Sequence, residues 1–428
     1  MLKLMPNVII ILCTLMHIVI DATTSQDQFA SRGIGRFTRE IVTRMVEEAS
    51  KTNTDHTFSL ILFNAPTTLN GLVKEHADRV RTINIGTCRL SGKFDGIWWR
   101  LQYRPAIKRI IQKHNPDLYY CPYFLRGFAP KDIPTVVMIY DFAFPVIGRY
   151  SMAPRYLDWI RRMQYHRALK KVKNAAGVVT ISDNTKSDIV TYIPGIDMDK
   201  VRTIYLGLPE TLKPRKPRPK VLDNYIPKQG IENGYILYYG GLEVNKNVPN
   251  LVRSYTELRS RWKSQRSDEP PSLVLAGGDF TRLDMRYPLL YEIREIIRTS
   301  HIEDYVFFTG NFEDEHCVDL LNGASLFLHL SLYEGFGFSP LEAMKCGRPV
   351  VASNRSCYPE VLRNGALLVD PEDPTKVADA CYSVLTDSRT AQTLQKKAIA
   401  VADLYTWKRT VRELVGYLEE VSELSKPS

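Results

Sequence analysis

The stretch that decides the fold reads Ser331-Leu-Tyr-Glu334-Gly-Phe-Gly-Phe-Ser-Pro-Leu-Glu342. An apolar run at residues 324–332 leads into it and predicts a buried parallel strand. A glycine-rich turn follows, and we expect a helix capped by Ser339 with Pro340 at its first position. A second strand is expected at residues 350–352. Strand, turn, helix and strand form a βαβ unit, which predicts a parallel sheet.

Two carboxylates mark this stretch as a candidate binding site. Glu334 precedes the expected helix and Glu342 lies inside it, eight residues further along the chain. Backbone N–H groups at the start of the helix would point into the same crevice, and a helix N-terminus favours anionic or hydroxyl-rich ligands. The alternative is a structural βαβ unit whose two glutamates lie on the surface.

The same alternation of apolar strands and helix-length segments runs through the whole chain. No hairpin signal interrupts it, so we expect an α/β protein with two doubly wound parallel sheets, each resembling a Rossmann domain. The expected strands lie at residues 17–21, 58–63, 117–120, 135–141, 177–182 and 202–208 in the first half, and at 235–239, 272–276, 305–309, 324–332 and 350–352 in the second.

A proline-rich basic segment, residues 213–220, marks the boundary between the halves. The apolar segment at residues 8–20 is shorter than the roughly 20 residues of a membrane span, so we expect its end to be the first strand. The predicted organisation is an N-terminal extension at 1–15, a Rossmann-like acceptor domain at 16–210, a linker at 211–230, a Rossmann-like donor domain at 231–400 and a C-terminal helix at 401–428 that crosses back to the first domain.

Charge is unevenly distributed along the chain, whose net charge is +10. Residues 16–210 hold 28 Lys and Arg against 18 Asp and Glu, whereas residues 231–428 hold 22 against 28. The basic half could attract an anionic membrane surface or an acceptor that carries a diphosphate, and the alternative is ordinary solvated surface charge. A nucleic-acid partner is not expected, because no basic stripe with interleaved aromatic residues is present.

The seven cysteines form no C-x-x-C pair. This pattern fits reduced thiols in the cytosol better than a disulfide framework or a zinc site. We therefore expect a cytoplasmic protein, and the basic half adds a peripheral position on the inner face of the cell membrane as a variant of that expectation.

Polar and glycine-rich segments follow several of the expected strands, where ligands of open parallel sheets bind. Tyr140 and Asp141 end the strand at residues 135–141. Gly33 and Gly35 form a Gly-x-Gly turn between the first strand and a helix, an arrangement that lets backbone approach a phosphate or a sugar closely.

A lysine follows the first strand of the second half. Lys246 comes shortly after Gly240 and stands at the start of an expected helix. A cation beside a helix N-terminus and glycine-rich backbone predicts a clamp for a diphosphate.

The run E-G-F-G-F-x-x-L-E-A-M-x-x-G-x-P-V-V-A-S, which begins at Glu334, is far more specific than a lone glycine-rich turn. It resembles the donor-sugar signature of the family 4 glycosyltransferases, which are retaining enzymes of the GT-B fold. The resemblance extends over residues 16–425. It implies that Glu342 binds the ribose of a nucleotide and that Glu334 contacts the hydroxyls of the donor sugar.

The resemblance also implies donor contacts from the backbone. Amides of the glycine-rich turn would hold hydroxyl and phosphate groups, and the loop that contains Phe312 would read the nucleobase. The donor-binding residues expected on these grounds are Gly33, Gly35, Tyr140, Gly240, Lys246, Phe312, Glu334, Gly335, Phe336, Gly337, Phe338 and Glu342, and the expected catalytic residues are Glu334, Lys246 and Asp141.

The chain departs from the family pattern in two places. Tyr140 stands where many members have a histidine, and a tyrosine can bond a hydroxyl but cannot do imidazole chemistry at neutral pH. Gly241 stands where an arginine often accompanies the lysine, so Lys246 acts alone or with an arginine from elsewhere. Asp197-Met-Asp199 spells the D-x-D of metal-using transferases, but it lies in a loop, so no metal and no other cofactor is expected.

The wording Gly33-Ile-Gly-Arg36-Phe resembles that of mannosyl- and rhamnosyltransferases of surface polysaccharides within the family. The expected function is transfer of a hexose, with mannose from GDP-mannose as the first choice, to a glycan or a lipid-linked glycan acceptor. Two alternatives stay open. One is a transferase that uses UDP-hexoses, and the other is a non-catalytic subunit that binds a nucleotide sugar, which the departures at Tyr140 and Gly241 motivate.

Overall fold

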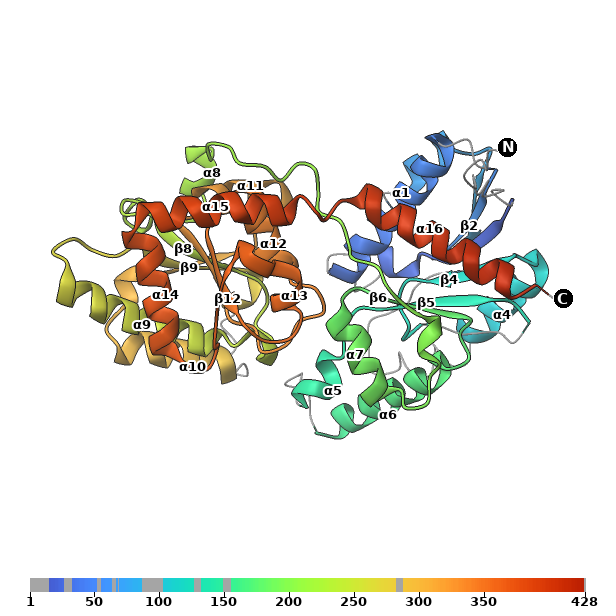
Figure 1. Ribbon diagram of the computed structural model, residues 1–428, viewed down its shortest axis with the longest axis horizontal. Helices are drawn as coiled ribbons and strands as arrows, with labels where there is room; N and C mark the ends of the chain where they lie inside the picture. The colour runs from blue at the N-terminus through green and yellow to red at the C-terminus, as the bar shows by residue number, and fades with distance from the viewer. Residues whose placement is uncertain are drawn as a thin grey trace, which may run out of the picture.

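Two parallel β-sheets, one of seven strands and one of six, form the framework of the chain (Figure 1). The computed structural model describes residues 15–26, 33–51, 55–63, 67, 69–86, 103–126, 132–148, 155–281 and 288–426. Successive residues of one strand pack into different cores: Ile236 and Tyr238 lie in one, and Leu237 in the other. Both faces of the sheet are therefore covered by helices, and the predicted doubly wound architecture is confirmed.

The N-terminal sheet has the strand order β3-β2-β1-β4-β5-β6-β7. Its strands are β1 (His17–Asp21), β2 (Thr57–Leu62), β3 (Val80–Asn84), β4 (Leu118–Cys121), β5 (Thr135–Ile139), β6 (Gly177–Thr180) and β7 (Val201–Thr203). Its helices include α1 (Gly33–Lys51), α2 (Leu69–Glu75), α4 (Arg104–His114), α5 (Ala143–Ile147), α6 (Arg155–Val172) and α7 (Asp183–Tyr192). The order reverses between β1 and β4, which makes the carboxyl ends of these two strands the switch point of the sheet.

The C-terminal sheet has the strand order β10-β9-β8-β11-β12-β13. Its strands are β8 (Tyr235–Tyr239), β9 (Ser272–Ala276), β10 (Val306–Gly310), β11 (Leu326–His329), β12 (Val350–Ser353) and β13 (Leu367–Val369). Its helices are α8 (Pro219–Asp223), α9 (Val248–Gln265), α10 (Pro288–Thr299), α11 (Asp314–Gly323), α12 (Phe338–Lys345), α13 (Tyr358–Leu362), α14 (Pro374–Thr386) and α15 (Ser388–Ala402). Here the switch point lies between β8 and β11.

The first strand is where the sequence predicts it, since β1 covers His17–Asp21. The predicted extension at residues 1–15 lies almost wholly outside the described residues and stays a prediction. Two strands, β3 and β13, were not predicted. Each lies at the edge of its sheet. Only Val80 of β3 is buried and no residue of β13 is, so the burial that marks the central strands is lacking in both.

Two helix starts differ from the predictions. Helix α12 begins at Phe338, with Gly337 rather than Ser339 in the cap position, so Pro340 is its third residue instead of its first. Gly337 has a φ of +82°, a conformation that glycine adopts without strain. Gly33 and Gly35 lie within helix α1 (Gly33–Lys51), so the predicted Gly-x-Gly turn is helical in the structure.

The basic linker is anchored to the C-terminal domain. Arg215 and Arg218 both donate to the carboxylate of Asp319 in α11, which is fully buried. The backbone N–H of Arg215 also donates to the side chain of Asn322 at 2.9 Å. The predicted linker is therefore held against α11 at Arg215 and Arg218.

The chain ends on the domain where it begins. Helix α16 (Trp407–Leu424) is capped by the side chain of Thr406, which accepts a hydrogen bond from the backbone N–H of Arg409. It lies beside α1 in the N-terminal half (Figure 1). The Tyr417 hydroxyl donates to the carbonyl oxygen of Lys200 at 2.5 Å and accepts from the backbone N–H of Val178. This is the crossing back that the sequence predicts.

Candidate functional site

An ion pair lies at the switch point of the C-terminal sheet. Lys246, which follows β8 in a short 3-10 turn (Val244–Lys246), donates from Nζ to Oε1 of Glu334 at 2.6 Å. Glu334 follows the neighbouring strand β11, and the same Oε1 accepts a hydrogen bond from Ser331 at 2.7 Å. The Ser356 hydroxyl lies against the backbone N–H and carbonyl of Glu334. The structure thus brings two of the predicted catalytic residues into direct contact.

The two charges of this pair support each other. Burial raises the pKa of the Glu334 carboxyl, but the charge of Lys246 outweighs burial and holds that pKa below its ordinary value. Burial likewise opposes the charge on Lys246, while Glu334 and then Glu243 raise the pKa of its ammonium above its usual range. Both groups are therefore ionised at neutral pH.

Asp141 faces this pair from the N-terminal domain. It follows β5, and its Oδ1 accepts a hydrogen bond from the backbone N–H of Ala143 at 2.9 Å. Burial raises the pKa of the Asp141 carboxyl, and the negative charge of Glu334 raises it further, against the lowering effects of the Ala143 amide and Lys246. All three predicted catalytic residues therefore lie close enough to influence one another.

Glu342 is held by a residue from the other domain. Its Oε1 lies 3.2 Å from a guanidinium nitrogen of Arg36, in the first turn of α1. The Glu342 side chain is only 4% exposed, whereas that of Arg36 is 36% exposed. Burial raises the pKa of the Glu342 carboxyl despite the nearby guanidinium. The sequence analysis named Arg36 as part of the Gly33–Phe37 motif but gave it no role. Its position directly after the Gly-x-Gly pair is the feature of the sequence that could have marked it as a site residue.

The glycine-rich turn lies against the N-terminal domain. A Cβ atom at Gly335 would overlap the backbone carbonyl oxygen of Tyr140, so only glycine permits this approach. Phe338 stacks on Phe37 of α1, with ring centroids 3.9 Å apart and an interplanar angle of 21°. Phe336 is buried and packs against the ring of Tyr405, at 5.4 Å between centroids. The turn is therefore an interdomain surface as well as a candidate ligand surface.

The side chain of Tyr140 lies in the core. Its side chain is 6% exposed, and its ring stacks with that of Phe37 at 6.3 Å. Its buried hydroxyl makes no hydrogen bond in the structure. Burial raises the pKa of this hydroxyl well above its usual range. Its predicted donor contact would require the aromatic packing around it to rearrange.

The remaining predicted donor residues lie around the end of β8. Gly240 donates its backbone N–H to Ala276 O at 3.1 Å, and a Cβ atom on Gly277 would overlap the Gly240 carbonyl oxygen. Phe312 lies beside Tyr239, the last residue of β8, with ring centroids 5.5 Å apart. These residues border the Lys246 and Glu342 positions, whereas Gly33 and Gly35 approach from α1.

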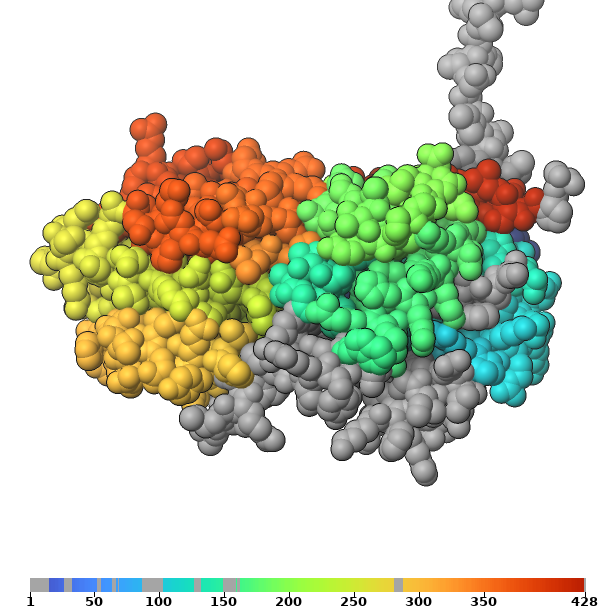
Figure 2. Space-filling model, turned by 90° about the horizontal axis from the view of Figure 1, so that it is seen from below, coloured from blue at the N-terminus to red at the C-terminus, as the bar shows by residue number. Residues whose placement is uncertain are grey.

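Further contacts across the cleft were not predicted. The Tyr333 hydroxyl donates to Asp188 Oδ2 of α7 at 2.5 Å and accepts from the Phe142 backbone N–H. Glu360 of α13 accepts hydrogen bonds from the backbone N–H groups of Asp183 and its neighbour at the start of α7. Figure 2 shows the corresponding surfaces, orange and green, in contact. Such pairs are distant in sequence and leave no local pattern.

A buried histidine lies beneath the ion pair. His329 ends β11, and its Nδ1 lies 2.7 Å from the Tyr358 hydroxyl and 3.2 Å from that of Ser331. Burial, helped by the charge of Lys246, lowers the pKa of His329 to about 3. His329 is therefore neutral near pH 7, and no imidazolium competes with Lys246 for Glu334.

Asp197 and Asp199 have a local structural role. Asp197 caps a 3-10 turn (Met198–Lys200), where its Oδ1 accepts from the backbone N–H of Asp199 at 3.1 Å. In the part of the chain that the structure describes, no group of three His, Cys, Asp or Glu side chains is arranged to hold a metal ion.

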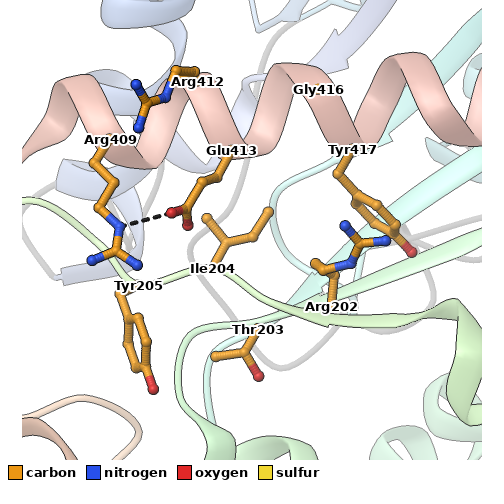
Figure 3. A pocket seen from close by; sticks show the side chains of 9 residues that line it. All are labelled: Arg202, Thr203, Ile204, Tyr205, Arg409, Arg412, Glu413, Gly416 and Tyr417. Carbon is orange, nitrogen blue, oxygen red and sulfur yellow. Dashed lines mark hydrogen bonds and ion pairs between the residues drawn. The ribbon is translucent and has the colours of Figure 1, made fainter. Parts of the chain in front are cut away.

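A separate groove of about 460 Å³ lies between β7 and α16 (Figure 3). Its lining includes Arg409, which is paired with Glu413 of the same helix, and Arg202, which is paired with Glu420. None of its lining residues belongs to the predicted site. The candidate site is the group of residues around Lys246, Glu334 and Glu342, where the two domains contact each other.

Among the described residues, no helix is both long enough and apolar enough to cross a bilayer.

Comparison with known families agrees with this geometry. Residues 32–211 match the family described as Glycosyltransferase Family 4, and residues 223–401 match Glycosyl transferases group 1. The chain belongs to the family 4 glycosyltransferases. The first matched region contains every strand of the N-terminal sheet except β1, and the second contains the whole C-terminal sheet of this family 4 member. The Lys246–Glu334 pair falls within the second region.

Two curated relatives of this family 4 chain are named as mannosyltransferases. O-antigen chain mannosyltransferase B of Escherichia coli is 28% identical over 60% of this chain and 64% of its own length. The serotype-specific mannosyltransferase WbdA of Escherichia coli is 24% identical over 92% of this chain and 47% of its own length. The chain thus spans about half to two thirds of the length of these relatives.

Solved structures support the GT-B fold. Sucrose-phosphate synthase from Thermosynechococcus elongatus superimposes with a TM-score of 0.71 at 19% identity, covering 96% of this chain and 100% of that one. HepE of Anabaena, solved in complex with UDP and glucose, has a TM-score of 0.66 at 18% identity, over 95% of this chain and 100% of that one. At these identities the likeness concerns the fold alone.

Proposed function

We propose that this protein transfers a hexose from a nucleotide diphosphate sugar to a glycan or lipid-linked glycan acceptor, with retention of anomeric configuration. The observation that carries the proposal is the contact of Lys246 with Glu334 at the switch point, with Asp141 facing it from the other domain. A cation, an acceptor carboxylate and a glycine-rich turn at that place suit the diphosphate and hydroxyls of such a donor.

Mannose from GDP-mannose is the donor that we favour. The support is that curated relatives at 24–28% identity are named as mannosyltransferases of the O antigen or of a serotype. UDP-hexoses are the alternative, since the HepE structure contains UDP and glucose. The base pocket includes Phe312 and Tyr239, whose aromatic rings suit either base.

The chemistry that we propose is electrostatic. The bond between the anomeric carbon and the diphosphate oxygen breaks first, and charge builds on the departing diphosphate. Lys246 and the backbone amides at the start of α12 stabilise that charge, while Glu334 accepts hydrogen bonds from the sugar hydroxyls. The acceptor oxygen then bonds to the anomeric carbon on the same face, and its proton passes to the departing phosphate oxygen. A trapped glycosyl-enzyme adduct would contradict this scheme.

Asp141 has a place beside the reacting sugar in this scheme. Its pKa is raised by burial, and it lies beside the negative charge of Glu334, so a positive charge between the two carboxylates is favoured. The anomeric centre carries such a charge as the donor bond breaks. No metal and no other cofactor is part of the proposal.

A contact with the membrane surface is part of the proposal as well. Helix α4 buries Ile107 and Ile111 and carries basic residues along the rest of its length. That charge would attract an anionic leaflet and bring the acceptor domain to a lipid-linked acceptor. Binding to vesicles with and without anionic lipid, at two salt concentrations, tests this part separately.

A panel of sugar nucleotides tests the function. Purified protein is mixed with GDP, UDP and dTDP sugars, and the shift of its melting temperature identifies the donor. Release of the nucleoside diphosphate is then followed with glycan and lipid-linked acceptors. We expect turnover with one donor. If the protein binds a donor but neither transfers nor hydrolyses its sugar with any of the acceptors, the non-catalytic alternative is supported instead.

A further inference from the structure

The ion pair between Arg36 and Glu342 places a cation where the proposed donor must bind. The two atoms are 3.2 Å apart and the residues come from different domains. Glu342 is buried inside α12, whereas the Arg36 side chain is about a third exposed on α1. The Arg36 end of the pair is therefore the one that can move.

The carboxylates of Glu334 and Glu342 are each paired with a cation. Lys246 lies against Glu334, and Arg36 lies against Glu342. These two pairs carry no excess positive charge, and Asp141 adds a further carboxyl beside them, although a diphosphate carries at least two negative charges. At Gly241, beside β8, the chain has no side chain to add a cation. Besides Lys246, the cation that reaches this site from the other domain is that of Arg36.

We propose that Arg36 is that second cation, and that it stays on Glu342 until the ribose of the donor takes its place. This inference rests on the proposed function, because it assumes a nucleotide diphosphate sugar as the ligand. Ribose hydroxyls donate hydrogen bonds to the Glu342 carboxylate in place of the guanidinium. Arg36 is then free to bond the diphosphate.

The chemistry of the two groups favours this exchange. Burial opposes the charge on Arg36, but the carboxylate of Glu342 outweighs burial and raises its pKa, so the guanidinium keeps its charge throughout. A guanidinium binds phosphate oxygens through two parallel hydrogen bonds, a geometry that lysine lacks. Arg36 lies near the N-terminal end of the described part of α1, on the side of the helix that contacts Glu342.

The alternative is that Arg36 only holds the two domains together. Under that alternative, removing the Arg36 side chain changes the affinity for a nucleoside and for a nucleoside diphosphate by the same factor. Under the exchange, the affinity for the diphosphate falls while the affinity for the nucleoside stays the same or rises. A nucleoside has to break the Arg36–Glu342 pair without gaining a phosphate contact, whereas a nucleoside diphosphate gains that contact.

The test compares ligands that differ only in phosphate. Binding of guanosine, GMP and GDP, and of uridine, UMP and UDP, is measured by calorimetry on the full chain and on Arg36→Gln, Arg36→Lys and Glu360→Gln. For the base that the wild type binds, Arg36→Gln should weaken diphosphate binding by roughly 10- to 100-fold. It should leave nucleoside binding unchanged or make it tighter.

Two further variants complete the comparison. Arg36→Lys keeps the charge and should fall between the wild type and Arg36→Gln with the diphosphate. Glu360→Gln removes a different contact across the cleft and should change nucleoside and diphosphate binding by similar factors.

The outcomes separate the inference from the function. If Arg36→Gln weakens nucleoside and diphosphate binding equally, Arg36 is only a link between domains and the inference is wrong. If diphosphate binding is unchanged in both Arg36 variants, it is wrong as well. If the wild type binds neither GDP nor UDP, the proposed function itself fails, and the inference fails with it.

Discussion

Glu360 accepts a hydrogen bond from the backbone N–H of Asp183 at 2.7 Å, and so caps a helix of the opposite domain. Its other oxygen accepts from the next N–H, that of Asn184, at 3.0 Å. A carboxylate at a helix N-terminus stabilises the helix through the exposed N–H groups and the helix dipole. Here the same contact stabilises the closed arrangement of the two domains, because α7 and α13 belong to different sheets.

Replacing this carboxylate should loosen the closed arrangement. Glu360→Gln removes the charge and one acceptor oxygen, which we expect to cost the closed form on the order of 1–2 kcal/mol. The measurement is the radius of gyration in solution without ligand, which should rise. Glu232→Gln, an exposed change in the same domain, is the control and should leave it unchanged. Equal radii for both variants would contradict the prediction.

Removing Lys246 should affect stability and binding separately. Lys246→Ala leaves Glu334 partly buried without its cation, which we expect to cost on the order of 3 kcal/mol of unfolding free energy. The double variant Lys246→Met with Glu334→Gln removes both charges and should recover most of that loss. Both variants should bind nucleoside diphosphates more weakly than the wild type, because both lack the ammonium group of Lys246. Denaturant unfolding and calorimetry give the two readouts, and a double variant that binds like the wild type would refute the role of Lys246.

A methyl group at Gly335 should block domain closure. Gly335→Ala would push a Cβ atom into the backbone carbonyl of Tyr140, and backbone cannot rotate away as a side chain can. We expect kcat to fall by about tenfold or more, while each domain stays folded, because a cleft held open misplaces the reacting groups. The control is Gly416→Ala in α16, where a Cβ atom meets nothing within 4 Å. That variant should keep its activity and gain up to about 1 kcal/mol of stability.

The buried histidine should make stability depend on pH. The pKa of His329 is about 3 in the folded protein and 6.5 in the unfolded chain, so between these values only the unfolded chain takes up the proton. Stability is therefore full above pH 6.5 and is lost as pH falls toward 3, by up to about 1.4 kcal/mol per pH unit. His329→Asn should flatten the dependence of unfolding free energy on pH between 7 and 5. His301→Asn, at an exposed position, should follow the wild type, and parallel curves for all three proteins would contradict this account.

The sequence predicted what local chemistry controls. Buried strands such as β8 and β12 are apolar runs, and Glu334 and Lys246 could be placed because each follows such a run. The edge strand β3 was missed because most of its side chains are exposed, which removes the apolar signal. The start of α12 was misplaced because the left-handed conformation of Gly337 sets it, which leaves Ser339 inside the helix instead of capping it.

Contacts between the domains could not be predicted in the same way. Arg36 and Glu342 meet only because two sheets face each other, and nothing near either residue signals the partner. The same holds for Tyr140, which a strand-end rule places at the ligand but aromatic packing against Phe37 holds in the core. A strand end fixes where a side chain begins, while its neighbours decide where it points.

Helix α16 has a consequence for how the protein is made. Its buried residues, among them Trp407, Leu414 and Leu418, complete the core of the domain that contains β1. These residues are synthesised after the whole of the second domain. The N-terminal domain therefore becomes complete only after the second domain has been synthesised. During synthesis its core stays partly exposed, while the second domain, complete by about α15, can already fold.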